Sequence, residues 1–238
     1  MKTVHNKLHR TPVTIRINRL LWILCLFPVA ILAGTYQKSH ITQEEPPLRQ
    51  RVENYFKPGF ALLEKAAKKQ PDKKTFRKIM KPLVRNFDGF AEATLLDKDF
   101  IIRKTYYKRD VAAVGYDLKK TACLKNFHTE MLKHPSPQIS GPTKPHLMQP
   151  SVIVLRMPVL SDKKELTWVL SLMIKTDHFL KATGLDTCKA CRITCQDGCS
   201  ICKGKLSKKH KQITVKLPSA EWVIEYEKTD NTNKENKQ

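Results

Sequence analysis

The sequence predicts an α+β domain behind one apolar segment near the N-terminus. Three observations predict it: apolar residues recur at helical spacing after residue 48, three pairs of strand-like runs follow with short polar turns between them, and residues 20–37 carry no charge. Helices that precede runs of strands, without strict alternation, favour a mostly antiparallel sheet of about six strands with helices on one face. We therefore expect one extracytoplasmic domain after one transmembrane helix.

The apolar segment follows residues 1–19, which carry five basic side chains and no acidic one. A positive flank before a short apolar run directs export and keeps the N-terminus in the cytoplasm. We expect residues 20–37 to be a single-pass signal anchor, with the rest of the chain periplasmic or at the cell surface. Because the apolar core of about 15 residues is short for a span, a cleaved signal peptide and a buried helix of a soluble protein are the alternatives.

The chain has a net charge of +22, from 44 basic and 22 acidic residues. A field of this sign favours anionic partners such as lipid headgroups, surface polysaccharide or an acidic small molecule. We do not expect nucleic acid as a partner, because the domain is expected outside the cytoplasm and the sequence has no zinc-finger, helix-turn-helix or ribonucleoprotein motif. The alternative is an ordinary solvated surface, since the lysines are scattered in pairs.

The helical elements lie before and between the strands. Apolar residues at three- and four-residue spacing predict a long helix over residues 48–69, in which Pro58 and Gly59 predict a kink or break. Asp72 is expected to cap a second helix, and a third is expected over residues 117–133. The apolar face of the second helix consists of Phe76, Ile79, Met80, Leu83 and Val84.

The strands are expected to form three hairpins, over residues 90–96 with 100–107, 151–160 with 166–174, and 213–217 with 222–226. The run at 166–174 is almost wholly apolar, so we expect it to be central in the sheet and covered on both faces. Residues 134–150 contain five prolines and are expected to form a loop that crosses the domain.

These elements define the expected organisation of the chain. It comprises a basic region, an anchor, a spacer, one domain with a cysteine-rich insertion, and a disordered polar tail: residues 1–19, 20–37, 38–47, 48–228 with the insertion at 184–209, and 229–238.

Five cysteines in the insertion have the spacing C-x2-C-x3-C-x3-C-x2-C, which is symmetric about Cys195. Partners on two antiparallel strands have residue numbers with a constant sum, so the symmetry favours two disulfides across one hairpin, Cys188 with Cys202 and Cys191 with Cys199. Disulfides persist outside the cytoplasm, although the connectivity itself is not fixed by the sequence.

Cys195 would then lie at the tip of the hairpin, where it could pair with Cys123 or with another chain. The alternative is a zinc site formed by the four thiolates of two C-x2-C pairs, and thiol exchange is a third possibility. The zinc ligands would be Cys188, Cys191, Cys199 and Cys202. Only seven residues separate the two pairs, which is shorter than the usual zinc-ribbon spacing.

No catalytic motif is present in the sequence. It has no G-x-S-x-G elbow, no H-E-x-x-H, no P-loop and no dinucleotide fingerprint, and its eight histidines are dispersed. We expect no enzyme activity and no cofactor, apart from the zinc alternative.

Three stretches carry a family resemblance. Residues 89–97 form a strand that ends at a turn, residues 115–118 open a helix, and residues 152–179 combine an apolar strand, Pro-Val, a turn, a second apolar strand and a short helix. In this order the region 48–228 resembles the extracytoplasmic PAS-like sensor domains of the Cache and CHASE type. The resemblance implies a PAS-like fold with a ligand pocket between the sheet and the helix and loop that cover it. The tyrosine, arginine, tryptophan and aspartate ligand motif of these sensors is not recognisable in this chain.

Arg156 is the first candidate for such a pocket, because it is a charge on an otherwise apolar strand, on the same face as Val152 and Val154. A charge in that position needs a partner. An anionic ligand is one choice, and a structural ion pair with Asp117 or Asp177 is the other.

Tyr107 and Tyr116 complete the candidate site, either as ligand-stacking groups or as core aromatics. The expected function is a membrane-anchored ligand-binding domain, sensor-like or accessory. It would lack an output module and signal through another membrane protein or through a homodimer along the 48–69 helix. The alternatives are a disulfide-stapled, basic envelope interaction protein without a small ligand, and a zinc- or thiol-active protein built on residues 188–202.

Overall fold

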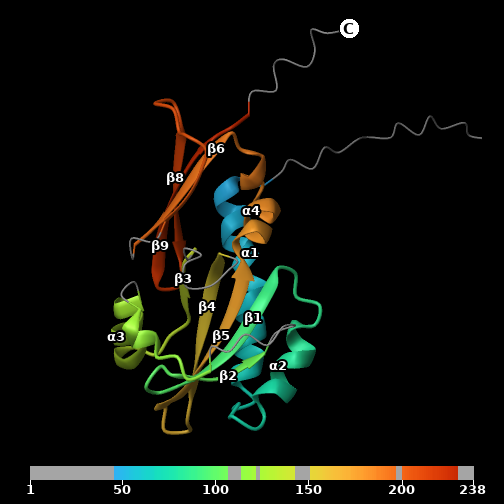
Figure 1. Cartoon of the computed structure of the whole chain (residues 1–238), viewed down its shortest axis with the longest axis vertical. Helices are drawn as coiled ribbons and strands as arrows, with labels where there is room; N and C mark the ends of the chain where they lie inside the picture. Colours follow the sequence, from blue (N-terminus) through green and yellow to red (C-terminus); the bar gives the residue numbers. More distant parts are fainter. Residues whose placement is uncertain (1–45, 107–113, 122–123, 143–150, 197–199, 230–238) are drawn as a thin grey trace, which may run out of the picture. The chain divides into compact units, whose positions relative to one another are not determined.

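The computed structural model describes residues 46–106, 114–121, 124–142, 151–196 and 200–229 (Figure 1). The helices are α1 (Leu48–Ala67), α2 (Phe76–Val84), α3 (Lys125–Lys133) and α4 (Thr176–Thr183). The strands are β1 (Phe90–Asp97), β2 (Ile102–Tyr106), β3 (Gln138–Ser140), β4 (Val152–Leu160), β5 (Leu166–Lys175), β6 (Ala190–Cys195), β7 (Ser200–Lys203), β8 (Lys211–Leu217) and β9 (Ala220–Glu227).

The long N-terminal helix is confirmed, but the expected break at Pro58 and Gly59 is wrong. Helix α1 continues through both residues. Gly59 instead provides a close approach between α1 and the sheet, because a Cβ atom at this position would lie 2.5 Å from Cδ1 of Leu155 on β4. The glycine therefore serves packing rather than a bend.

The main sheet has five antiparallel strands in the order β2-β1-β5-β4-β3. Strand β5 is central, as its apolar sequence predicts, and the first two expected hairpins are confirmed as β1–β2 and β4–β5. Strand β3 was not expected, since its three residues lie in the proline-rich stretch that reads as a loop. It pairs with β4 and forms one edge of the sheet.

The expectation of one sheet with a cysteine-rich insertion is wrong. Strands β6 and β7, from the region expected to be an insertion, join the closing hairpin β8–β9 in a separate four-stranded sheet with the order β7-β6-β9-β8. Figure 1 shows this second sheet and α4 beside the upper part of α1, while the five-stranded sheet lies along its lower part. The residues expected to form an insertion thus supply two of the four strands of the second sheet.

Helix α1 packs on both sheets. Its buried residues include Val52, Phe56 and Leu63, and Phe56 stacks on Phe179 of α4 at 5.3 Å and meets Trp222 of β9 edge-to-face at 5.5 Å between ring centroids. These aromatic contacts bury large apolar areas at the point where α1, α4 and β9 meet. Through them, one apolar core extends from the five-stranded sheet to the second sheet.

Helices cover both faces of the five-stranded sheet, not one as expected. Helix α3 packs on the face opposite α1, with Phe127 and Met131 against Leu96 and Val169. The expected helix over residues 117–133 is divided into a single 3-10 turn at Leu118–Lys120 and the shorter helix α3.

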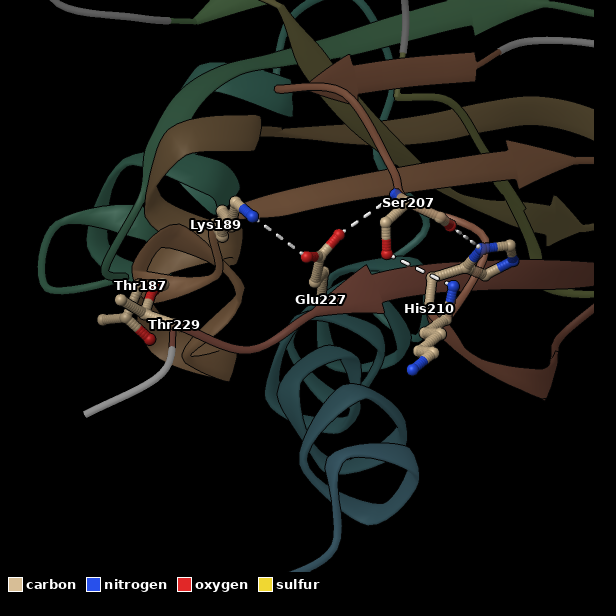
Figure 2. A network of polar contacts seen from close by, with 7 residues as sticks. Thr187, Lys189, Ser207, His210, Glu227 and Thr229 are labelled. Atoms are coloured by element: carbon tan, nitrogen blue, oxygen red, sulfur yellow. Dashed lines mark hydrogen bonds and ion pairs between the residues drawn. The ribbon is translucent and has the colours of Figure 1, made fainter. Parts of the chain in front are cut away.

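Polar contacts around the end of β9 hold one end of the second sheet (Figure 2). Glu227 pairs with Lys189 at 3.2 Å and accepts a hydrogen bond of 3.0 Å from the backbone N–H of Ser207. The hydrogen bonds from Ser207 and Lys189 lower the pKa of Glu227. A further hydrogen bond runs from Thr229 Oγ1 to the Thr187 carbonyl at 2.8 Å.

The expected anchor at residues 20–37 and the tail from residue 230 lie outside the described residues. Among the helices that are described, none combines the length and apolar character needed to cross a membrane.

Candidate ligand-binding face of the five-stranded sheet

The two faces of the five-stranded sheet differ in chemistry. Strand residues alternate between faces, and residues opposite one another in the register share a face. On the side of α1, the buried side chains of the sheet are all apolar: Ala93, Leu95, Ile139, Ile153, Leu155, Met157, Val159, Leu170, Leu172 and Ile174. This face makes an ordinary hydrophobic core.

The opposite face buries six polar side chains, which we call the polar face: Glu92, Thr94, Gln138, Ser140, Arg156 and Ser171. Arg156 on β4 lies directly opposite Gln138 on β3 and Ser171 on β5. Ser171 in turn lies opposite Thr94 on β1. Buried polar groups cost free energy when they have no partners. Their concentration on one face indicates that this face has a role besides core packing.

Arg156 is 3% exposed and lies near the middle of this face. Its guanidinium donates a hydrogen bond to the Ser140 hydroxyl and sits over the ring of Phe127 on α3, with Cζ 4.2 Å from the ring centroid. Burial of a guanidinium against an aromatic ring and a hydroxyl fixes its plane. The sequence-based expectation that Arg156 shares a face with Val152 and Val154 is confirmed by the alternation of β4.

Glu92 on β1 is 5% exposed and brings a carboxyl group to the same face. Burial raises its pKa to about 7. Within the described part of the chain, its Oε1 atom has no hydrogen-bond partner. A cationic group that reached Glu92 would restore its ionised form.

His128 on α3 faces the sheet, with its ring 4.8 Å from that of Phe100 between centroids. Burial, and then the Arg156 guanidinium, lower its pKa, while Asp117 acts in the opposite direction. Its Nε2 atom has no hydrogen-bond partner among the described residues. A neutral imidazole therefore adds a further buried polar group above the polar face.

The structure places the other expected site residues around or outside this face. The Asp117 side chain accepts a hydrogen bond of 3.0 Å from the Lys119 N–H and is near enough to His128 to affect its pKa. Tyr116 is 42% exposed and shares a hydrogen bond of 3.1 Å with the Thr121 hydroxyl. Asp177 is exposed on α4, which packs against α1 and not on the polar face. Tyr107 lies outside the described residues.

The cysteines depart from the expected arrangement. No disulfide joins the four that are described, Cys188, Cys191, Cys195 and Cys202. The register of β6 with β7 differs by four residues from the one that the symmetric spacing predicts, so Cys202 lies opposite Arg192, and Cys191 lies opposite Lys203. Cys191 is fully buried whereas Cys202 is exposed, so the two thiols lie on different faces of the hairpin.

The zinc alternative depends on the same segment. In the described residues, no three His, Cys, Asp or Glu side chains are grouped so as to hold a metal ion. Cys199 and Cys123, which the disulfide or zinc arrangements would use, lie outside the described residues.

Sequence reasoning identified Arg156 but missed most of its surroundings. Gln138 and Ser140 were assigned to a loop, because a three-residue strand between prolines has no periodic signal. Glu92 and Thr94 alternate with Ala93 and Leu95, so the position of Glu92 inside a strand was the available signal for a buried carboxyl group.

No family model and no curated protein matches this sequence. Solved structures match the fold. An extracellular ligand-binding receptor from Desulfohalobium retbaense has a TM-score of 0.57 at 14% identity, over 75% of this chain and 38% of that one. This chain therefore spans well under half of that receptor.

Two further structures match over most of their own length. The ligand-binding domain of the Pseudomonas aeruginosa amino acid chemoreceptor PctC, in complex with GABA, has a TM-score of 0.51 at 15% identity, over 75% of this chain and 93% of that one. The periplasmic sensory domain of the Campylobacter jejuni chemoreceptor Tlp1 has a TM-score of 0.51 at 12% identity, over 75% and 90%. The expected resemblance to extracytoplasmic sensor domains of the Cache type is confirmed at the level of the fold.

Proposed function

We propose that residues 48–228 form an extracytoplasmic sensor domain that binds a small organic ligand on the polar face of the five-stranded sheet. The observation that carries the proposal is the contrast between the buried side chains of the two sheet faces. Those under α1 are all apolar, whereas the other face buries six polar side chains. A few convergent polar groups among apolar walls are typical of small-molecule sites.

The ligand class follows from the charges on that face. The buried Arg156 guanidinium favours a carboxylate or another anionic group. Glu92, whose pKa is raised to about 7 by burial, would meet an ammonium group. A molecule that carries both groups, as amino acids and GABA do, is the first candidate, and GABA is bound by one of the structurally similar chemoreceptor domains.

The proposal includes the setting of the domain. Residues 20–37 would anchor it to the membrane with the domain outside the cytoplasm, as in the periplasmic and extracellular domains of similar fold. Signalling would then pass through another membrane protein or through a homodimer along α1.

A thermal unfolding screen of the full chain tests this function. The panel contains amino acids, small carboxylates, amines and purines, and a ligand that binds only the folded protein raises the melting temperature by mass action. We expect a concentration-dependent rise with at least one carboxylate-bearing amine. If no compound in any class raises the melting temperature, the sensor function is wrong and an interaction protein that uses its basic surface replaces it.

A further inference from the structure

A cavity lies where α3, β3 and the second sheet meet. Its volume is about 90 Å³, and its walls come from three places: Phe127 on α3, Gln138 and Ser140 on β3, and Cys195 and Trp222 on β6 and β9. In Figure 1, β3 is the strand of the five-stranded sheet that lies beside the β8–β9 hairpin. Only two members of the polar face reach this cavity, so it is a separate place in the fold.

A larger cleft borders the cavity at the end of the second sheet. The two share Cys195, Gln196, Ser219 and Ala220 as wall residues, and the outer cleft has a volume of about 510 Å³. The walls that belong to the cleft alone, among them Thr194, Glu221 and Val223, alternate with Cys195 and Trp222 along their strands, so the cleft lies mainly on the opposite face of the second sheet from the cavity.

Two buried donors line the inner cavity without an acceptor. Trp222 is fully buried and Gln138 is 4% exposed, and neither Trp222 Nε1 nor Gln138 Nε2 has a hydrogen-bond partner in the described part of the protein. Indole is a donor only, and a buried donor without an acceptor retains its full desolvation cost. Both observations point to an occupant that accepts hydrogen bonds.

A third donor is available beside them. The Ser140 hydroxyl accepts its hydrogen bond from Arg156, so its own hydrogen is left to donate. Three donors match a carboxylate, which has about four acceptor positions and no donor. An amide would bring N–H donors of its own into this group of donors, whereas a carboxylate brings acceptors alone.

Size and apolar surface restrict the carboxylate further. A water molecule needs about 10–15 Å³ of such volume, so the cavity accommodates roughly six water-sized bodies. Leu124, Phe127 and Ile139 supply apolar wall for an alkyl group. We propose that this junction is a second binding site, which takes a short-chain aliphatic carboxylate.

The position of the site gives it a structural consequence. Next to the cavity, the Ile139 N–H donates to the Pro218 carbonyl at 3.2 Å, and the Ser219 hydroxyl donates to the Pro137 carbonyl at 3.2 Å. These bonds join the edge of the five-stranded sheet to the β8–β9 turn. A carboxylate that bridges Gln138 and Trp222 strengthens the same joint between the two sheets.

The indole N–H resonance of Trp222 tests the proposal directly. Replacement of Trp22 and Trp168 by Phe in the full chain leaves Trp222 as the only tryptophan. Titration with sodium acetate, at ionic strength matched by sodium chloride, is expected to shift this resonance downfield and to saturate. Acetamide, which has the same shape without the charge, is expected to leave it in place.

Variants separate this site from the polar face. Gln138→Leu is expected to weaken acetate binding about tenfold or more, as for the loss of one hydrogen bond to a charged acceptor. Gln212→Leu, an exposed position on β8, and Ser171→Ala, on the polar face, are expected to leave it unchanged. If Gln138→Leu does not fold, Ser140→Ala takes its place.

Three results would overturn the proposal. The first is a Trp222 resonance that acetate does not shift. The second is an equal shift with acetamide. The third is an indole N–H that exchanges with water equally fast at every acetate concentration. The acetate titration tests the cavity, whereas the thermal screen tests the polar face. A negative acetate titration therefore leaves the proposed function of the polar face standing, and a negative thermal screen leaves the cavity proposal standing.

Discussion

Single residues carry the strongest functional signal in this protein, and Glu92 and Arg156 are the two that matter most. Both are buried on one face of a sheet, and the buried side chains of the other face are all apolar. Arg156 could be recognised from the sequence because it interrupts a run of apolar residues. The position of Glu92 inside a strand was a weaker signal, because a single acidic residue in a strand usually points to solvent. Only the register places its side chain on a buried face.

The pH dependence of stability tests the burial of Glu92. Its pKa rises from 4.5 in the unfolded chain to about 7 in the fold, so the folded state holds the proton over this window. The contribution of Glu92 is therefore most favourable below pH 4.5 and is lost as pH rises through 7. Glu92→Gln should remove this loss and stabilise the protein at pH 8 by about 1 to 2 kcal/mol, after allowance for water at the site.

Denaturant unfolding across pH 4 to 8 measures the effect, with the exposed Glu221→Gln as the matched control. A Glu92→Gln profile parallel to that of the wild type would show that Glu92 is solvated in the folded protein.

The helices and strands were predicted well where the apolar periodicity extends over many residues. They were predicted poorly where a contact between distant residues determines the structure. The long helix and the two hairpins of the main sheet follow from apolar spacing over many residues. Strand β3 has only three residues, and the register of β6 with β7 depends on a turn outside the periodic pattern. The symmetric cysteine spacing pairs Cys191 with Cys199, four residues away from its observed partner Lys203.

The role of Gly59 gives a test at the level of α1. Helix propensity alone predicts that Gly59→Ala stabilises the protein by about 1 kcal/mol. The structure predicts the reverse, a loss of about 1 kcal/mol or more, because the new Cβ atom would lie 2.5 Å from Leu155, which is fully buried.

Ala61→Gly, at an exposed position two residues along the same helix, is the control and should cost about 0.5–1 kcal/mol from propensity alone. Chemical denaturation of the three proteins measures the comparison. A Gly59→Ala protein that is more stable than the wild type would show that α1 does not approach β4 as described.

Thiol reactivity tests the register of the β6–β7 hairpin. Cys202 is exposed, whereas Cys191 is fully buried and burial raises its pKa, so Cys202 should react with an alkylating reagent in the native protein and Cys191 only after unfolding. Peptide mass spectrometry under non-reducing conditions resolves the sites. Recovery of a Cys188–Cys202 disulfide in place of alkylated Cys202 would contradict the observed register.

At the scale of the whole molecule, α1 joins two sheets into one core, and the polar face and the junction cavity both lie beside β3. One sheet was expected because the cysteine spacing favours an insertion in the stretch that contains β6 and β7. The pairing of β6 with β9 is a contact between distant residues, which no local pattern encodes. The α+β class, the central strand and the likeness in fold to extracytoplasmic sensor domains could be predicted. The division into two sheets, and with it the junction between them, could not.

The measurement that tests the central claim most directly is a calorimetric titration of the ligand found by thermal screening, into three forms of the full chain. These are the wild type, Arg156→Met on the polar face, and Arg192→Met as the control. The Arg192 side chain is 48% exposed and pairs with Glu225 at 3.5 Å. Loss of one buried charge-assisted contact should weaken binding about tenfold or more in Arg156→Met, with Arg192→Met unchanged. Equal affinity in all three would contradict a ligand site on the polar face.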